Sequence, residues 1–370
     1  MASNFEPLIS IITLTYNHQD YVAECIESVM CQTYPNWEMI IVDDASTDKT
    51  PYIVEQYLKK DSRIKFIRNE KNNGPLFLDV NYNLALKEAK GEWIGYLEGD
   101  DVFTPKSLQH RVEALRSLSA KDRENISLVY GRYGRIWMDA RVVDRPIPYY
   151  ENDRYANIIN NKPVGQSLLC FLQGLNFIPA GSVLINKEKL DRIGGFKQYP
   201  REIRLVDYCT WTYLALEGEF LYLPKTLYFW RRHSDSISMK HHEEIEKSNL
   251  DFVIFFWSNH KDRILEKIKF ANFQNCLGVQ AKLELAKLYL LKRNYKTASD
   301  LLSQVELCPY IKEFFPEIFK KKLLVTKIAN KLKLPMVLDF ALYFKRRKLD
   351  KIKIIGNYEP FFFRHFKEID

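Results

Sequence analysis

Three carboxylates lie within four residues of one another in the sequence Glu98-Gly99-Asp100-Asp101. They follow a short apolar and aromatic run, Trp93 to Leu97, which predicts a buried strand. Carboxylates this close repel one another, and a divalent cation with hard oxygen ligands relieves that repulsion. The sequence therefore indicates a cation site at the end of a strand, although a solvated acidic turn fits the same stretch.

A second acidic group ends another apolar run. Glu38 to Val42 predicts a strand, and Asp43 and Asp44 follow it directly. In open α/β sheets, ligands bind where the strands end and the helices begin. Two strands that both end in acidic residues therefore indicate a ligand site at this edge of the sheet.

The elements that must position these residues alternate along the first hundred residues. We predict strands at Leu8–Leu14, 38–42, Ile64–Ile67 and 93–97, and helices from about Asp20, from Thr50-Pro51 and from the loop at Asn69–Gly74 to about Ala89. A further helix should begin at Thr104-Pro105, with threonine as its N-cap and proline in its first turn. This alternation predicts an α/β protein with a parallel, doubly wound sheet.

Composition places the chain among folded, soluble proteins of two domains. It has 370 residues, of which 46% are hydrophobic and 28% charged. No apolar run approaches the roughly 20 residues of a membrane-spanning helix, and the N-terminus lacks the features of a signal peptide. We therefore expect a cytoplasmic protein, and we expect its six scattered cysteines to be reduced thiols.

The positive charge of the chain is concentrated at its C-terminal end. Residues 320–370 contain 14 Lys and Arg and 5 Asp and Glu, a net of +9, against +8 for the whole chain. Basic clusters interleaved with apolar residues suit an anionic membrane surface, so we expect a peripheral contact at the inner face of the membrane. A solvated helix face or a packing surface fits equally well. No recognition motif supports nucleic-acid binding.

The stretch from Pro7 to Thr50 also carries a family resemblance. Its segments Tyr16-Asn17, QTYPNWE and VDDASTD, together with the later EGDD loop, resemble in order and spacing the nucleotide-binding half of the family 2 glycosyltransferases. The resemblance implies a GT-A fold, a Rossmann-like and mostly parallel central sheet flanked by helices. It implies a glycosyltransferase domain at 1–240, with a nucleotide-binding half at 1–105 and an acceptor half at 106–240. Residues 241–370 are then a helical C-terminal region with a basic tail.

The resemblance assigns the acidic loop to a metal ion. Asp100 is the expected direct ligand of a divalent cation, Mn²⁺ or Mg²⁺, and Glu98 is a weaker candidate because the family has aspartate in its place. Asp101 caps the next turn, orders the loop or binds. His233, in the segment Arg231-Arg232-His233, is a further weaker ligand, and this segment resembles one that closes over the donor phosphates.

The resemblance places the donor nucleotide at the first two strand ends. Tyr16 should stack on uracil, Asp44 should accept the uracil N–H, and Asp43 should order the loop or contact the ribose. A turn aromatic and a self-capping turn are the structural alternatives for these positions. Where the family commonly has an Ala-Arg-Asn step near the phosphates, this chain has Asn81-Tyr82-Asn83, and the arginine is absent. Either Asn83 and the metal suffice, or the Arg231–His233 segment should supply the positive charge.

Asp207 is the expected general base. It follows Gly194-Gly195-Phe196, which resembles the segment ahead of the acceptor site, and it opens a predicted helix where the family has a Glu-Asp pair. Val206 replaces the glutamate. A carboxylate there can accept the proton of the attacking hydroxyl, although a carboxylate favoured by the helix dipole fits the same position.

These residues together predict an inverting glycosyltransferase that moves a sugar from a nucleotide donor, a UDP-sugar first, to a glycan or lipid-linked acceptor in surface polysaccharide synthesis. A catalytically silent binding or scaffold subunit is the alternative, because three family positions are substituted. A nucleotidyltransferase is a third hypothesis, but TYNHQD is not the Gly-rich basic loop it requires. Beyond residue 240, His241–Phe270 predicts a helix and Ala281–Glu306 a helical hairpin.

Overall fold

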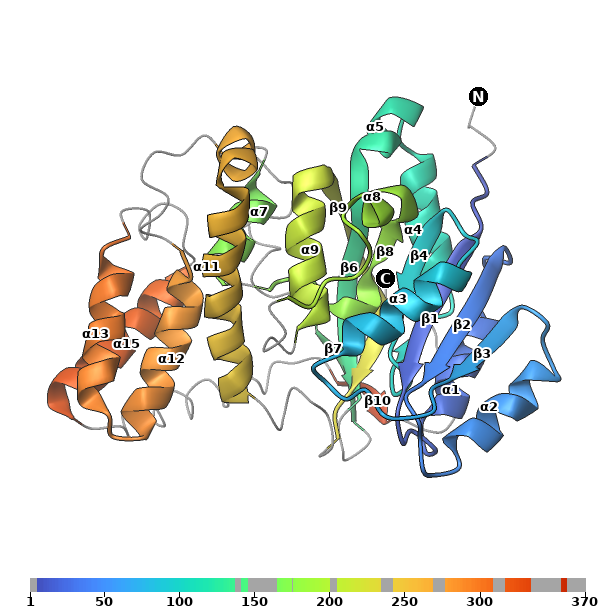
Figure 1. Cartoon of the computed structure of the whole chain (residues 1–370), viewed down its shortest axis with the longest axis horizontal. Helices are drawn as coiled ribbons and strands as arrows, with labels where there is room; N and C mark the ends of the chain where they lie inside the picture. Colours follow the sequence, from blue (N-terminus) through green and yellow to red (C-terminus); the bar gives the residue numbers. More distant parts are fainter. Residues whose placement is uncertain are drawn as a thin grey trace.

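The structure is a computed structural model and describes nine stretches of the chain. These are residues 5–136, 141–145, 165–174, 176–199, 205–233, 242–268, 277–308, 317–333 and 354–357. Figure 1 shows a twisted sheet with its covering helices on the right and a group of helices on the left.

The N-terminal half forms the parallel part of the sheet. Its strands are β1 (Ile9–Thr15), β2 (Trp37–Asp43), β3 (Ile64–Arg68) and β4 (Trp93–Tyr96). They lie in the order β4-β1-β2-β3, and neighbouring strands are parallel. The connecting helices are α1 (Val22–Met30), α2 (Thr50–Leu58) and α3 (Leu78–Glu88). The predicted alternation of strands and helices is confirmed here to within two residues at most strand ends.

The second half extends the same sheet, mostly with antiparallel pairs. Its strands are β5 (Val102–Phe103), β6 (Ile126–Ile136), β7 (Arg141–Arg145), β8 (Leu184–Asn186), β9 (Glu219–Arg231) and β10 (Ile354–Asn357). β8 joins β4 to β6, and β9 pairs with both β5 and β6. The pairing of Val102 with Phe229 matters most for the site, because it brings the end of β9 beside the acidic loop that follows β4.

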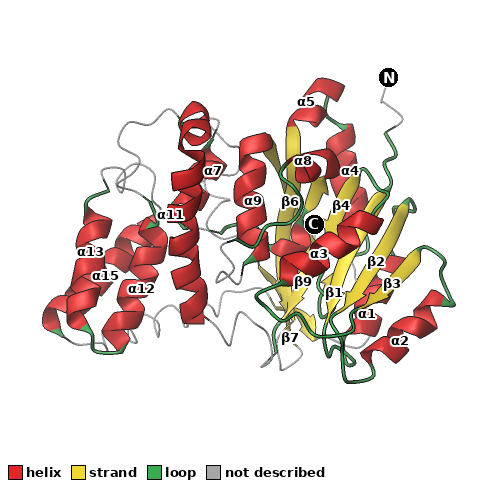
Figure 2. Ribbon diagram, in the orientation of Figure 1, coloured by secondary structure: helices red, strands yellow, loops and turns green. Residues whose placement is uncertain are grey.

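Helices cover both faces of the sheet (Figure 2). In β1, Ile9 and Ile11 belong to one buried cluster, which they share with α1 and α2, whereas Ile12 and Leu14 belong to the other, which contains residues of α3. Side chains alternate between the two faces of a strand, so a strand with apolar side chains on both faces is buried on both sides. This explains why the strands of the first half read as continuous apolar runs.

The helix after the acidic loop begins later than predicted. α4 spans Ser107–Arg116, and its N-cap, Lys106, makes no capping hydrogen bond through its side chain. The hydroxyl of Thr104 instead lies 3.1 Å from the carbonyl oxygen of Thr226 and 3.2 Å from that of Leu227. The prediction of Thr104 as an N-cap is therefore wrong, because this threonine joins the loop to β9.

The remaining described helices lie among the strands of the second half and in the C-terminal region, which was predicted to be helical and also contains β10. They are α5 (Ala120–Asn125), α7 (Gln166–Leu172), α8 (Lys187–Arg192), α9 (Val206–Glu217), α11 (His242–Lys267), α12 (Val279–Leu291), α13 (Tyr295–Glu306) and α15 (Glu317–Leu332). The hairpin predicted at Ala281–Glu306 is confirmed as α12 and α13. The boundaries proposed at residues 105 and 240 stay predictions.

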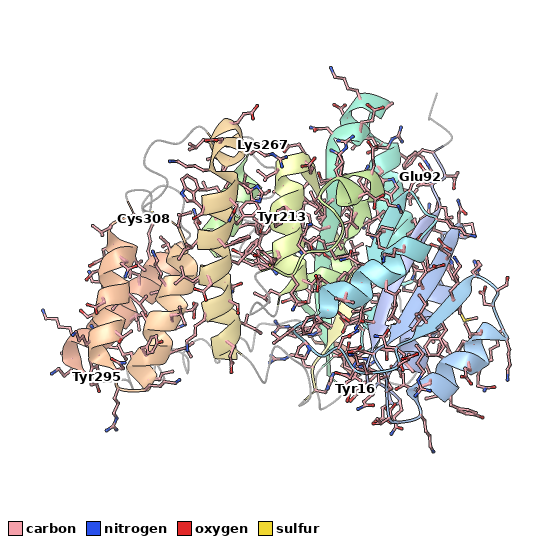
Figure 3. All side chains as sticks on the ribbon, in the orientation of Figure 1. Tyr16, Glu92, Tyr213, Lys267, Tyr295 and Cys308 are labelled. Carbon is pink, nitrogen blue, oxygen red and sulfur yellow. The ribbon has the colours of Figure 1, made fainter. Side chains whose placement is uncertain are left out.

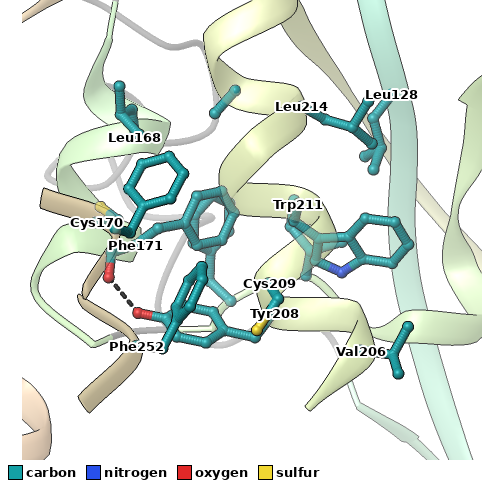
Figure 4. Packing of buried hydrophobic residues seen from close by; sticks show 14 of the residues in the cluster. Leu128, Leu168, Cys170, Phe171, Val206, Tyr208, Cys209, Trp211, Leu214 and Phe252 are labelled. Carbon is teal, nitrogen blue, oxygen red and sulfur yellow. Dashed lines mark hydrogen bonds between the residues drawn. The ribbon is translucent and has the colours of Figure 1, made fainter. Parts of the chain in front are cut away.

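One buried cluster runs from the sheet through α9 to the C-terminal helices. Figure 4 shows its centre, where the hydroxyl of Tyr208 donates a hydrogen bond to the carbonyl oxygen of Phe171 and Phe252 packs on Tyr208. Trp211, on the same helix as Tyr208, is fully buried. These buried contacts fix the position of α9, and with it the position of the first turn of the helix.

The cysteines only partly follow the prediction of reduced thiols. Cys25, Cys31, Cys170 and Cys209 are free, but Cys308 is disulfide-bonded, so the prediction is wrong at that position. In the part of the chain that the structure describes, no helix combines the length and the apolar character needed to cross a bilayer.

Candidate active site

Gly99 lets the acidic loop lie directly on the end of β1. Its N–H donates to the carbonyl oxygen of Leu14 at 2.9 Å. A Cβ at this position would lie 2.9 Å from both that oxygen and the Nδ1 of His18, which is closer than real Cβ contacts. Glycine is therefore required here, and it holds Glu98 and Asp100 against the first strand end.

Asp100 is paired with His233. The Oδ2 of Asp100 lies 2.8 Å from the Nε2 of His233, and both side chains are largely buried. Burial alone would raise the pKa of Asp100, but the hydrogen bond from His233 and the charge of His18 outweigh it, so the pKa lies below its usual value. The structure thus brings together two of the predicted metal ligands.

His18 is a neighbour that the sequence did not indicate. Its ring centroid lies 6.4 Å from that of His233, and its Nδ1 is buried without a hydrogen-bond partner. Burial lowers the pKa of His18. The imidazole of His18 therefore lies beside the paired Asp100 and His233.

Glu98 is held by two tyrosines rather than by solvent. The hydroxyls of Tyr82 and Tyr96 both donate to its Oε1, the second at 2.8 Å. The two rings stack with their centroids 4.7 Å apart. Burial raises the pKa of Glu98 to about 7 although these hydrogen bonds oppose the shift, and the charges of Asp100 and Asp207 add to it.

Asp101 orders the loop, one of its predicted alternatives. Its Oδ1 accepts a 2.9 Å hydrogen bond from the backbone N–H of Arg231, and the side chain is buried. This bond continues the pairing of β5 with β9. Asp101 therefore positions the Arg231–His233 segment relative to Asp100.

Arg231 is an anchor in this structure. Its Nη2 lies 2.6 Å from the Oε2 of Glu24, and its Nε donates to the carbonyl oxygen of Asp100 at 2.9 Å. Its guanidinium also lies over the ring of Tyr21. Arg232 stacks on Trp230 with its Cζ 5.4 Å from the ring centre. Residues 234–238, which complete the predicted lid segment Phe229–Ser238, lie outside the described residues.

The residues at the ends of β1 and β2 differ in their exposure to solvent. Tyr16 is 45% exposed at the end of β1, and Figure 3 shows it at the lower edge of the sheet. Asp43 is fully buried at the end of β2, where it accepts hydrogen bonds from the N–H and the hydroxyl of Ser46. Burial raises the pKa of Asp43. Asp43 therefore orders its loop, and Tyr16 presents an aromatic face to solvent.

Asp44 holds the loop that follows β3. Its carboxylate accepts hydrogen bonds from the N–H groups of Asn73 and Gly74 and from the side-chain amide of Asn69, at 2.8 to 3.1 Å. The amides of Asn69 and Asn73 also donate to the Oδ1 of Asn81. An asparagine-rich loop thus closes over the second strand end.

Asn83 is committed to a different part of the fold. Its Nδ2 donates to the carbonyl oxygen of Phe196 at 2.9 Å, and its Oδ1 accepts from the N–H of the same residue at 2.8 Å. Gly195 has φ +82° and leaves no room for a side chain beside Asn83. Asn83 therefore fixes the predicted Gly194–Phe196 turn against α3, and its amide does not point a free group at a phosphate.

Asp207 lies in the first turn of α9, as predicted. Its Oδ2 accepts a 2.8 Å hydrogen bond from the Nδ2 of Asn176. Burial raises its pKa, and the hydrogen bonds from the backbone N–H of Tyr208 and from Asn176 only partly oppose this. The charge of Asp207 also acts on Glu98 and Tyr96. The predicted base and the predicted metal ligands thus share one region.

The side chains do not form a ready-made metal site by themselves. Among the described residues, no group of three or more His, Cys, Asp and Glu is arranged to hold a metal ion. Asp100 and His233 nevertheless offer one carboxylate and one imidazole, and Mg²⁺ or Mn²⁺ commonly takes one or two protein ligands together with substrate phosphates. The residues therefore fit a cation that arrives with a diphosphate.

The site also includes five residues that were not predicted to belong to it: His18, Glu24, Tyr82, Tyr96 and Asn176. Most of them act through contacts between residues far apart in the chain, such as the 207 positions between Glu24 and Arg231, whereas Tyr96 bonds Glu98 two residues away. The apolar run at Trp93–Leu97 did mark Tyr96 as buried. Nothing in it indicated that the hydroxyl would bind a carboxylate.

Comparisons with known proteins agree on one family. A family model described as "Glycosyl transferase family 2" matches residues 10–201. TuaG of Bacillus subtilis (strain 168), named for teichuronic acid biosynthesis, is 31% identical over 237 residues, covering 64% of this chain and 83% of TuaG. WfgD of Escherichia coli, named a UDP-Glc:alpha-D-GlcNAc-diphosphoundecaprenol beta-1,3-glucosyltransferase, is 36% identical over 126 residues, 34% of this chain and 46% of WfgD.

Solved structures show the same fold at low identity. TarS 1-349 of S. aureus in complex with UDP superposes with a TM-score of 0.53 and 17% identity, over 89% of this chain and 90% of that one. The mannosyltransferase PcManGT of Pyrobaculum calidifontis, in complex with GDP-Man and Mn²⁺, gives 0.53 and 17%, over 88% of each chain. Both are GT-A-like glycosyltransferases, which confirms the predicted fold class.

Proposed function

The chain belongs to glycosyl transferase family 2 and is a transferase enzyme, and we propose that it inverts the anomeric centre as it moves a sugar from a UDP-sugar to an acceptor hydroxyl. Single displacement forms the bond from the acceptor oxygen to the anomeric carbon as the bond to the diphosphate breaks on the opposite face. The enzyme must therefore bind a nucleotide, hold a diphosphate and accept one proton. Three parts of the site correspond to these tasks.

The nucleotide lies at the ends of β1 and β2. Tyr16 offers an exposed aromatic face on which a pyrimidine can stack. Asp44 keeps the loop at residues 72–74 in place through hydrogen bonds to two backbone N–H groups, so its main contribution is to shape the base pocket. The names of TarS complexes and of WfgD, which mention UDP or UDP-Glc, support a uridine donor.

Asp100 and His233 face the diphosphate. A divalent cation bound with the donor would be held by these two side chains and would neutralise the charge of the leaving group. Asp101 and Arg231 keep the two ligands together through the hydrogen bond between the Asp101 carboxylate and the Arg231 N–H. PcManGT, whose structure contains Mn²⁺ with GDP-Man, supports a metal-dependent donor site.

Asp207 takes the proton of the acceptor hydroxyl. Its raised pKa makes it a stronger base than an ordinary aspartate. Asn176 orients the carboxylate through its hydrogen bond to Oδ2. Glu98, held by its two tyrosines, lies in the field of both Asp100 and Asp207.

One observation carries the proposal. Asp100 and Asp207 lie far apart in the sequence, yet both lie near Glu98. The hydroxyl of Tyr96 bonds Glu98, and its ring lies 6.1 Å from that of Trp211, on α9, which has Asp207 in its first turn. The charges of Asp100 and Asp207 both act on Glu98. A candidate leaving-group site and a candidate base therefore lie in the same region, as a single displacement requires.

The acceptor is a glycan or a lipid-linked sugar at the inner face of the membrane. The diphosphoundecaprenol named for WfgD and the basic C-terminal tail support this assignment. It leads to a surface polysaccharide as product, in agreement with the name of TuaG.

A screen of nucleotide sugars tests the proposal. The purified full chain is incubated with UDP- and GDP-sugars, with and without Mn²⁺, and the release of nucleoside diphosphate is measured. We expect metal-dependent turnover with a UDP-sugar and none with the Asp100→Ala variant. A chain that binds and cleaves none of these donors would contradict the proposal.

A further inference from the structure

α15 has a buried inner face. Leu323, Thr326 and Ala329 are at most 9% exposed. Ala329 lies in a small apolar cluster with Leu290 of α12 and Ala298 of α13. These contacts fix which side of the helix faces outward, at the end of the molecule away from the sheet (Figure 1).

The outer face of α15 is also apolar. Leu324, Ile328 and Leu332 are 58%, 42% and 55% exposed. Their spacing of four residues places them in one row along the helix. A helix at the surface of a soluble domain normally turns polar residues outward, whereas the described parts of the chain leave this row, the α15 stripe, exposed.

Positive charge accompanies the α15 stripe. The sequence from Lys320 to Lys333 contains six lysines and no Asp or Glu. Lys327, Lys331 and Lys333 are exposed. Lys327 is paired with Glu306 of α13. The face therefore combines three exposed apolar side chains with a net positive flank.

We infer that α15 docks in the plane of an anionic lipid bilayer, with the α15 stripe among the acyl chains and its lysines at the headgroups. An interfacial helix has this combination of an apolar face and a basic flank, and anionic lipids attract each lysine near the surface. A second copy of this chain is a poorer partner, because it would bring two rows of lysines together. This surface lies outside the transfer site, so docking does not depend on the proposed reaction.

Sedimentation with vesicles tests the inference. The full chain is mixed at low salt with vesicles of phosphatidylcholine alone or with added phosphatidylglycerol. We expect binding only to the anionic vesicles. Leu324→Ser with Leu332→Ser should weaken it at least about tenfold. Lys331→Gln with Lys333→Gln should weaken it about twenty-five-fold, since each lysine near such a surface contributes about fivefold.

Two control variants test whether the loss of vesicle binding is specific to α15 or follows from removing exposed apolar area or positive charge anywhere on the surface. Ile254→Ser with Leu265→Ser removes two apolar side chains of α11 that are 49% and 40% exposed, and Lys59→Gln with Lys121→Gln removes the same charge elsewhere. Both should bind as the parent does, and all variants should keep its melting temperature. The inference is overturned if the parent stays in the supernatant, if the α15 variants bind as tightly as the parent, or if they instead convert a dimer to a monomer. Vesicle binding without donor turnover would reject only the proposed function.

Discussion

The side-chain amide of Asn176 donates a 2.8 Å hydrogen bond to the Oδ2 of Asp207. The Oδ1 of Asn176 accepts from the N–H of Ile178, so the amide itself is held in one orientation. A carboxylate fixed at one oxygen presents the other in a defined direction. Two residues therefore have separate roles, which separate substitutions can test: Asp207 is the proposed base, and Asn176 orients its carboxylate.

Asp207→Asn should abolish turnover without weakening the fold. Loss of a general base costs about 10²- to 10⁴-fold in kcat, while the affinity for UDP should stay unchanged because the proposed nucleotide site lies at the ends of other elements, β1 and β2. Burial raises the pKa of Asp207, so its ionised form costs stability at neutral pH. The melting temperature of the variant at pH 7 should therefore equal or exceed that of the parent, and the difference should shrink as the pH falls through the raised pKa. Unchanged transfer would remove Asp207 from the mechanism.

Asn176→Ala should shift the pH profile rather than abolish turnover. The hydrogen bond from Asn176 favours the ionised carboxylate, so its loss raises the pKa of Asp207 further. Activity requires the ionised form and is lost as the pH falls, so the acid limb of kcat should move up by about one pH unit. Asn36→Ala, which removes an exposed amide bound to the carbonyl oxygen of Glu6, is the control. An unmoved acid limb would mean that Asn176 has only a structural role.

The positions of these residues on strands and helices were predictable, because they follow from local pattern. Apolar runs at 8–14 and 38–42 fixed two buried strands, and their polar ends placed Tyr16 and Asp44 at one edge of the sheet. Asp207 was expected at the start of a helix and lies in the first turn of α9. Periodicity and chain breaks determine such features within a few residues.

The partners of these side chains were not predictable, because they depend on how distant segments meet. Asn83 was expected near the phosphates, but the Gly194–Phe196 turn takes both ends of its amide. Arg231 was expected as a free cation for the donor, but the pairing of β5 with β9 carries it to Glu24. Tertiary register decides which donor meets which acceptor, and one sequence does not contain it explicitly.

Tyr16→Ala should weaken UDP binding by about ten- to a hundredfold, because stacking of a base on an aromatic ring contributes about 1–3 kcal/mol. Tyr16→Phe keeps the ring and should bind UDP nearly as the parent does. The side chain is 45% exposed, so neither change should lower the melting temperature. Calorimetric titration with UDP measures the effect. Equal affinities for the alanine and phenylalanine variants would show that the ring does not contact the nucleotide.

Asp44→Ala should weaken UDP binding and also loosen the loop at residues 72–74. It leaves the N–H groups of Asn73 and Gly74 without their acceptor, at a cost of about 1–3 kcal/mol in stability. Hydrogen exchange of these two amides, measured without ligand, should rise. Asp61→Ala, which removes an aspartate from the exposed turn before β3, is the control and should leave them protected. If UDP affinity falls while both amides stay protected, Asp44 contacts the base directly and does not act through the loop.

Arg231→Met should destabilise the fold by about 3–5 kcal/mol, because it leaves the largely buried carboxylate of Glu24 without its ion-pair partner. The double variant Arg231→Met with Glu24→Met removes both charges and should recover most of this loss in urea unfolding. Arg232→Met, next in the chain, should cost under about 1 kcal/mol because its guanidinium stacks on Trp230 at a half-buried position. If the double variant stays as unstable as Arg231→Met, the ion pair with Glu24 is not the cause of the loss.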